Sequence, residues 1–298
     1  FASLYGGGVV KSLNAGVSWS EINSGLADKY VIQLVVDPAR PNLIYALTST
    51  RGLFRYDTLL GGAWVFVGED LPQSTQSMEI YGTDDPRASR ETVLDEPPAA
   101  ANHPEGLPEA ENLITMVYAP SSPWVVYLGT GGSGVYKSLN GGKDWFPSGL
   151  EGLVINSLAV DPSNANIVYA IANNSGNVRV SLDGGGSWGT IQNSIYVSAA
   201  YSLAFARDGS RALYMGTSLG VLRYTSAAGW STTGLYNVNV PLVVTDRNHP
   251  GWIFAGTGNG AYISEDGSAT WQYGPQELAG LTVQSISFDP LQPQVVYF

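Results

Sequence analysis

The chain repeats one short motif, and the spacing of that motif is the strongest constraint on its fold. Each copy reads Ser, any residue, Asp or Asn, any residue, Gly, two further residues and Trp. Complete copies lie at 12–19, 138–145 and 181–188, a fourth at 264–271 has Ser in place of the glycine, and degenerate copies at 61–64 and 227–230 keep only the tail. The motif tryptophans Trp19, Trp64, Trp145, Trp188, Trp230 and Trp271 are 45, 81, 43, 42 and 41 residues apart.

The motif is typical of a tight β-hairpin. A short Asp or Asn side chain accepts bonds from backbone N–H groups a few residues on and closes the turn locally. The glycines take the positive φ that such a turn requires, and the Trp covers the hairpin with a large apolar ring. We therefore interpret the six tryptophans as structural, together with Ser12, Asn14, Ser138, Asn140, Ser181, Asp183 and Asp266.

A second periodic pattern predicts the strands. Apolar runs, most of them closed by Asp-Pro or a related turn, recur at 31–38, 113–120, 154–162, 200–208, 240–246 and 283–290. Such runs are expected of strands that are buried on both faces. Further strands and the motif follow most of them, and four short antiparallel strands per repeat make one propeller blade. We predict an all-β fold, a six-bladed β-propeller of four-stranded antiparallel blades, with seven blades as the alternative.

The two ends of the chain match parts of the same strand. Residues 294–298 align with 124–128, and residues 1–12 align with 127–138. We expect the terminal strands to meet in one shared blade and to close the ring by pairing, which would remove an open sheet edge. The match is also compatible with a window taken from a longer array, and with a mature or trimmed piece.

One interval exceeds the repeat length by about 40 residues, and the excess lies at about 70–112. Its prolines argue against regular strands. Eight acidic residues lie between Asp84 and Glu111, against two arginines. We predict a single domain over 1–298 that carries an irregular acidic insertion, with a degenerate seventh blade as the alternative. The candidate contact residues in the insertion are Asp84, Asp85, Arg87 and Arg90.

Composition argues against several classes of function. A net charge of −11 leaves no basic face for nucleic acid or an anionic membrane, and no apolar run approaches the roughly 18 residues of a membrane span. The absence of cysteine excludes disulfides and Cys-ligated zinc, and two histidines argue against a His-rich metal centre. We predict no metal, no cofactor, no nucleic-acid partner and no membrane span. Few lysines and no cysteine indicate an extracytoplasmic protein, whether secreted, periplasmic or at the cell surface.

The motif resembles the Asp-box, or BNR, repeat of sialidase-like β-propellers, and the resemblance covers nearly all of the chain except about 70–112. In that superfamily the boxes join the third and fourth strands of a blade. They lie at the rim, away from the usual ligand face. Xyloglucanase-like hydrolases and a photosystem II assembly factor carry similar repeats. The resemblance therefore implies the fold and leaves the reaction open.

The residues argue against enzyme activity without deciding it. Sialidases of this superfamily use an arginine triad, but the arginines here lie mostly on third strands or beside proline turns. Xyloglucanase-like hydrolases place an acid and a base across a cleft between two larger propellers, and this chain lacks the second wall. The photosystem II assembly factor relies on a basic patch that this sequence does not show. Glycoside hydrolysis requires two facing carboxylates, and their pairing cannot be identified from this sequence.

Blade topology places the candidate binding residues on one face. Loops between second and third strands share that face with the loops that enter each innermost strand, and propellers usually bind there. The candidates are Asp28, Tyr30, Arg51, Glu151, Tyr196, Tyr201, Tyr236 and Glu277. Tyrosines with few charges suit a protein or glycan surface. We predict a non-catalytic interaction or scaffold module that binds protein or glycan through this face and the insertion, within a larger assembly. The alternative is a glycoside hydrolase or lectin-like sugar binder that uses the central pocket.

Overall fold

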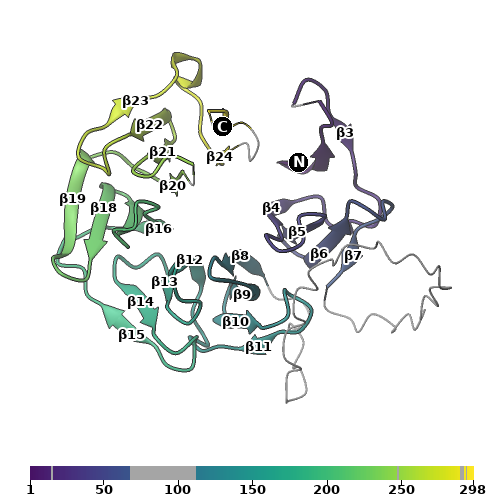
Figure 1. The fold of residues 1–298 in the computed structure, drawn as a ribbon, viewed down its shortest axis with the longest axis horizontal. Coiled ribbons are helices and arrows are strands. Elements are labelled where there is room, and N and C mark those ends of the chain that lie inside the picture. Colours follow the sequence, from purple (N-terminus) through teal and green to yellow (C-terminus); the bar gives the residue numbers. More distant parts are fainter. Residues whose placement is uncertain (15, 68–111, 247, 289–291, 293) are drawn as a thin grey trace, which may run out of the picture.

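The repeats form a ring of antiparallel sheets around an axis, a six-bladed β-propeller, as the motif spacing predicts (Figure 1). The computed structural model describes residues 1–67, 112–288, 292 and 294–298, except residues 15 and 247. Within these ranges the helical structure consists of a single 3-10 turn, η1 (Gln276–Leu278). The predicted insertion, with Asp84, Asp85, Arg87 and Arg90, lies outside the described residues apart from Asn112.

Five blades have four strands each, in chain order from the axis to the rim. The first is β4 (Val31–Val36), β5 (Leu43–Thr48), β6 (Gly52–Asp57) and β7 (Val65–Phe66). The second is β8 (Leu113–Ala119), β9 (Ser122–Thr130), β10 (Val135–Ser138) and β11 (Phe146–Pro147). The third is β12 (Ile155–Val160), β13 (Val168–Ala172), β14 (Val178–Ser181) and β15 (Gly189–Ile191). The fourth is β16 (Ala200–Phe205), β17 (Leu213–Thr217), β18 (Gly220–Thr225) and β19 (Gly229–Tyr236), and the fifth is β20 (Leu242–Thr245), β21 (Ile253–Thr257), β22 (Gly260–Ser264) and β23 (Gln272–Tyr273).

The two ends of the chain contribute the strands of the sixth blade. These are β24 (Ser287–Phe288) and β25 (Val296–Tyr297) at one end, and β1 (Ala2–Leu4), β2 (Gly8–Lys11) and β3 (Ser20–Glu21) at the other. Each group pairs within itself, and among the described residues no ladder joins β25 to β1, so the predicted pairing of the two ends is absent there. The physical reason is duplication, because β25 pairs with the inner strand β24 while β1 pairs with the third strand β2. Both ends thus supply the second-strand position, and they lie on either side of an opening in the ring (Figure 1).

The inner strands of neighbouring blades are joined by polar side chains. In four blades the inner strand shifts register by one residue near its start, and the next residue is polar. The Gln33 amide accepts the N–H of Met116 at 2.9 Å and donates to its carbonyl at 3.3 Å. Likewise Ser157 Oγ accepts the N–H of Leu203 at 3.0 Å, and Ser202 Oγ accepts that of Val243 at 2.9 Å. Each bond links one blade to the next.

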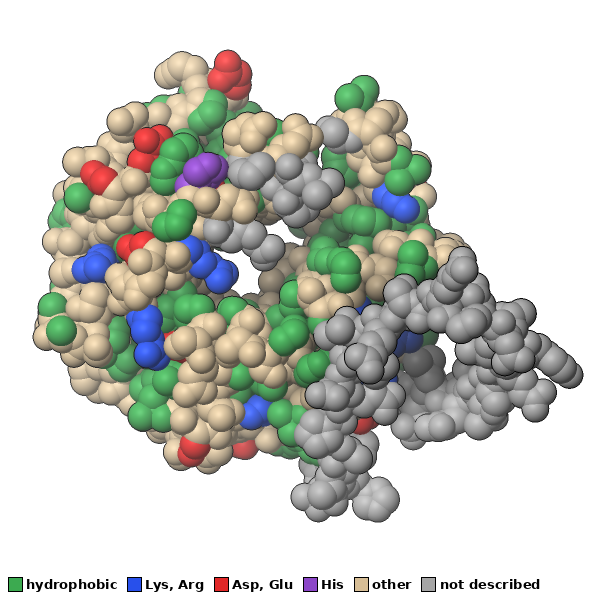
Figure 2. Space-filling view, viewed as in Figure 1, with side chains coloured by type: hydrophobic (Ala, Val, Ile, Leu, Met, Phe, Trp, Pro, Cys, Tyr) green, Lys and Arg blue, Asp and Glu red, His purple; other side chains and the backbone are tan. Residues whose placement is uncertain are grey.

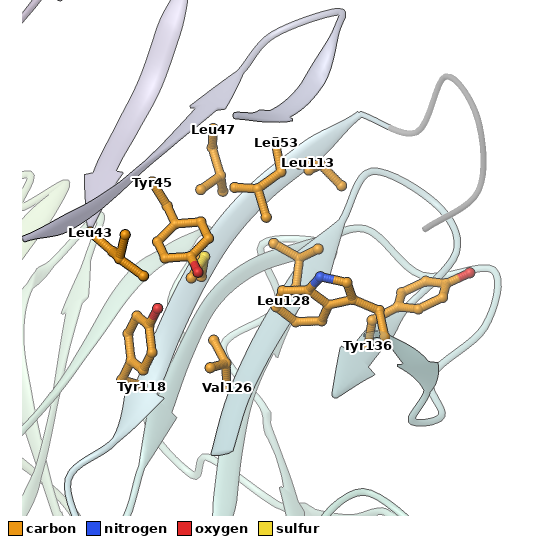
Figure 3. Packing of buried hydrophobic residues seen from close by; sticks show 11 residues of the cluster. Leu43, Tyr45, Leu47, Leu53, Leu113, Tyr118, Val126, Leu128 and Tyr136 are labelled. Atoms are coloured by element: carbon orange, nitrogen blue, oxygen red, sulfur yellow. The ribbon is translucent and has the colours of Figure 1, made fainter. Parts of the chain in front are cut away.

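Apolar packing between blades lies outside this inner ring. Between the first and second blades it includes Leu43, Tyr45, Leu47, Leu53, Leu113, Met116, Tyr118, Val126, Leu128, Tyr136 and Trp145 (Figure 3). The hydroxyl of Tyr45, on β5, crosses this contact and donates to the carbonyl of Gly141 at 2.9 Å. The hydroxyl of Tyr214 donates in the same way to Gly267 of the fifth blade, at 3.1 Å. Tyrosines of the second strand therefore donate hydrogen bonds to the box of the following blade.

The four boxes share one set of hydrogen bonds. The serine hydroxyl donates to the Asp or Asn side chain, in the pairs Ser12–Asn14, Ser138–Asn140, Ser181–Asp183 and Ser264–Asp266, at 2.8 to 3.0 Å. The same hydroxyl accepts the N–H four residues on, and the Asp or Asn oxygen accepts an N–H further along the turn. Every turn is therefore closed by its own residues.

The motif tryptophans differ in how far they are buried. Trp145, Trp64 and Trp230 are 2%, 3% and 8% exposed, whereas Trp19 is 46% exposed. Trp64 donates its indole N–H to the carbonyl of Ile22 in the preceding blade, at 2.6 Å. Burial thus depends on the neighbouring blade as well as on the box.

This difference predicts unequal costs for the same substitution. Trp145→Ala removes a fully buried ring and is expected to lower the free energy of unfolding by about 3–5 kcal/mol. Trp19→Ala, the matched control, is expected to cost less than about 1.5 kcal/mol because half of its ring already faces water. Equilibrium denaturation of both variants measures the difference, and equal costs would contradict the structural account of the boxes.

Candidate functional site

Two kinds of loop come together on one face of the ring, which we call the top face: the loops between second and third strands and the loops that enter the inner strands. Backbone bonds join them blade by blade. The Ser49 N–H donates to the Tyr30 carbonyl at 2.9 Å, and the Ser218 N–H to that of Ala199 at 2.9 Å. The predicted sharing of one face by these loops is therefore present.

Asp28 is a buried anchor of this face, 7% exposed. One carboxylate oxygen accepts the N–H of Tyr30 at 2.8 Å. The other accepts the Ser49 hydroxyl at 3.1 Å and both the N–H and the hydroxyl of Thr50 at 2.9 Å. Burial by itself raises the pKa of the carboxyl, but these hydrogen bonds outweigh it and hold the pKa below its ordinary value. The carboxylate is therefore ionised and accepts hydrogen bonds with both oxygens. It can hold the loops in place, but it is not a suitable proton donor.

The exposed tyrosines of the top face lie in its loops or, for Tyr236, at the end of β19. Tyr30 is 51% exposed and meets the ring of Tyr5 edge to face, with centroids 5.5 Å apart. Tyr196 is 85% exposed and Tyr236 46%, whereas Tyr201 is half-buried as the extra residue at the register shift of β16. These rings offer apolar area with a hydroxyl at low entropic cost.

The three remaining candidates are exposed charges on separate blades. Arg51 lies between β5 and β6, Glu151 before β12, and Glu277 in η1. Of the eight predicted residues, only Asp28 and Tyr30 are joined by a hydrogen bond among the described residues. The three carboxylates among the candidates, those of Asp28, Glu151 and Glu277, come from different blades, and no hydrogen bond joins them among the described residues.

Amides and hydroxyls complete this face, and among them sequence reasoning missed Asn156, Ser198 and Ser218. Asn173 and Asn174 are exposed at φ of 54° and 52°, and the N–H of Asn174 donates to the Asn156 side chain at 2.7 Å. The hydroxyl of Ser198 donates to that of Ser218 at 2.8 Å. Asn156 occupies the extra position at the β12 register shift, so the polar residues that interrupt the inner apolar runs were the available signal.

Charge is sparse on the part of the top face formed by the third to fifth blades. Between Asp183 and Asp246 the charged residues are Arg207, Asp208, Arg211 and Arg223. The first three follow β16 at the opposite end of the blade, and Arg223 lies within β18. The loops that join these blades on the top face therefore present tyrosines, amides and hydroxyls and contain no carboxylate, lysine or histidine.

On the opposite face, three buried aspartates bind neighbouring side chains. Buried Asp37 holds Arg40 at 2.7 Å, buried Asp161 binds Arg211, and buried Asp246 contacts the ring of His249 at 2.6 Å. Figure 2 shows a hollow at the axis with a few Lys and Arg side chains around it. No group of three potential metal ligands occurs among the residues that the structure describes.

A pocket of about 290 Å³ lies at the fourth box. It is lined by Ile263, Glu265, Asp266, Thr270, Gln272 and Tyr273. The Thr270 hydroxyl and N–H hold the pKa of Asp266 down at about 2. Because this carboxylate closes its own turn, the pocket contains no free carboxylate pair, and the box remains a structural element.

Comparison with known proteins shows the class of fold. No protein-family model matches the chain, and no curated protein does. Among solved structures, a GH74 enzyme of Niastella koreensis is 18% identical, with 98% of this chain and 47% of that one covered and a TM-score of 0.68. The structure of YCF48 bound to D1 peptide is 14% identical, with 87% of this chain and 71% of that one covered and a TM-score of 0.55. PorZ, a surface component of the type-IX secretion system of Porphyromonas gingivalis, is 15% identical, with 87% of this chain and 36% of that one covered and a TM-score of 0.54.

These likenesses confirm the β-propeller fold that the sequence predicts. At such low identities they show the fold alone. The chain spans about half the length of the GH74 enzyme. Across the described ranges, no helix combines the length and apolar character needed to cross a membrane.

Asp28 provides a test of the top-face anchor. Asp28→Ala is expected to cost about 1–3 kcal/mol because it leaves several loop donors unpaired. Since the folded pKa is lowered, the contribution of the carboxylate is complete above its ordinary pKa of 3.8 and is lost as the pH falls through the lowered folded value. Asp28→Asn should therefore be less stable than wild type at neutral pH and show a weaker further loss below about pH 4.

Denaturation curves between neutral and acidic pH measure both effects. Glu277→Gln is the matched control, because its exposed carboxylate accepts no hydrogen bond among the described residues. An acid response of Asp28→Asn identical to that of wild type would show that Asp28 does not anchor the loops.

Proposed function

We propose that this chain is a non-catalytic, extracytoplasmic interaction module that binds a protein or glycan partner through the exposed tyrosines and amides of the top face. The acidic insertion contributes to the same partner contact, within a larger assembly. The observation that carries the proposal is that the Asp28 carboxylate is buried and fully hydrogen-bonded. Among the described residues it is the one buried carboxylate on that face, and both of its oxygens accept hydrogen bonds from loop donors.

The chemistry of the surrounding surface supports binding rather than catalysis. Tyr196, before β16, and Tyr236, at the end of β19, offer exposed rings. Asn173 and Asn174 offer amides on the neighbouring third blade. Aromatic area with adaptable hydrogen bonding is typical of protein and sugar recognition surfaces. A hydrolase would need two carboxylates at a defined separation.

The structural neighbours support a binding role in outline. One of them is described with a bound D1 peptide and another is a bacterial surface component of a secretion system. Both carry a propeller of this kind, so the fold serves as a recognition scaffold outside enzymes. An extracytoplasmic location for this chain is part of the proposal, supported by the absence of cysteine and by the surface location of such neighbours.

The second candidate is a sugar binder or glycoside hydrolase that works at the central pocket. The likeness to a GH74 enzyme over 98% of the chain favours it. The tyrosine and amide composition of the top face suits a sugar as well as a protein. Release of reducing ends from xyloglucan by the purified chain would support the hydrolase, and binding of intact xyloglucan without release would support the lectin-like form.

Site-specific photo-crosslinking tests the interaction module. A photo-crosslinking amino acid in place of Tyr196 is expected to capture a partner from the extracellular fraction of the source cells, whereas the same group in place of Leu182, which is 70% exposed in the third box, should not. The double variant Tyr196→Ala, Tyr236→Ala should weaken binding of the captured partner at least about tenfold, since buried aromatic anchors dominate such contacts.

Leu182→Ala is the matched control and should bind as wild type does. Removing residues 84–111 should weaken capture further if the insertion takes part. Capture at Leu182 instead of Tyr196, or unchanged binding by the double variant, would contradict the proposed face.

A further inference from the structure

The fourth blade ends in an outer strand unlike the others. The outermost strands β3, β7, β11 and β23 have two residues and β15 has three, whereas β19 (Gly229–Tyr236) has eight. It lies last in its sheet, on the outer rim of the ring (Figure 1). No described strand pairs with its outer edge.

This edge lacks the features that normally prevent pairing. Proteins protect edge strands by making them short, by charged residues or proline, or by covering them. The sequence Gly-Trp-Ser-Thr-Thr-Gly-Leu-Tyr contains no charge and no proline. Ser231 and Thr232 are exposed, and the register with β18 is regular from Thr225–Gly229 to Leu222–Thr232.

One end of the strand is already covered, which limits the free edge. The Gly234 N–H donates to the Ser268 carbonyl of the fifth blade at 3.3 Å. A Cβ on Gly234 would lie 2.7 Å from the Ala269 carbonyl oxygen, so the contact is close. The open part therefore runs over 229–233, with Ser231 at its centre.

We propose that this edge pairs with the same edge of a second copy of the chain. Two antiparallel β19 strands related by a twofold axis near Ser231 would join two four-stranded blades into one continuous sheet. The strand is complementary to itself, because it brings no like charges opposite each other and presents hydroxyls that form favourable cross-strand pairs. The contact uses residues 229–233 and does not include Tyr236, the top-face residue at the end of the same strand, so it is separate from the proposed function.

The dimer forms in a concentration-dependent way. A single pair of strand edges buries much less than the roughly 1,600 Å² of a standard stable interface. Sedimentation velocity of the full chain over a wide concentration range should therefore show a monomer at low concentration and a dimer at high concentration.

Substitutions at Thr232 separate edge pairing from other contacts. Thr232→Lys places two positive charges close to the axis and should raise the dimer dissociation constant at least about tenfold. Thr232→Val keeps an uncharged β-branched residue and should dimerise as wild type does. Ser121→Lys, at an exposed turn of the second blade, controls for added charge and should also dimerise.

A synthetic peptide with the sequence of residues 229–236 gives a second readout on the unmodified protein, and in excess it should shift wild type towards monomer. This measurement decides the matter if Thr232→Lys fails to fold. Wild type that remains monomeric at every concentration would overturn the proposal. So would a Thr232→Lys variant that dimerises as wild type does, or a dimer that the peptide leaves unchanged.

Discussion

The bond from the box serine to its Asp or Asn partner is the interaction on which the repeat depends. It is the same in four blades, at 2.8 to 3.0 Å, and the serine then accepts an N–H from its own turn. Because each hairpin satisfies its polar groups internally, it needs no ion or ligand to keep its shape. The carboxylates of Asp183 and Asp266 are held by this arrangement.

The blades are joined by contacts between neighbours in sequence. Side chains of the inner strands cross from one blade to the next, and second-strand tyrosines such as Tyr45 reach the following box. The loops of the top face leave blades that these joints connect, so the joints help to position them. Asp28 adds a local anchor, and the exposed tyrosines stand on a scaffold that does not have to rearrange to present them.

The sequence allowed the fold to be predicted well and the site only in outline. Periodic tryptophans and apolar runs identify equivalent positions, so six blades and most strands could be placed from them. They do not show which residues of different loops or blades contact each other. The partners of Asp28 lie in Ser49 and Thr50, on another loop, so its burial could not be inferred. The motif does not distinguish the half-exposed Trp19 from the buried Trp145, and it gives no sign of the eight-residue length of β19, which follows a turn without the box residues.

The one-residue register shift of the inner strands has a consequence for how such a propeller can vary. It inserts an extra residue at the same place in four consecutive blades: Ile32, Ile114, Asn156 and Tyr201. These are aliphatic, amide and aromatic, while the ladders on either side keep their pairing. Since an unpaired residue contributes little to the ladder, its side chain can be exchanged without disturbing the sheet. The mouth of the ring is therefore a place where new specificity can arise at small cost to folding.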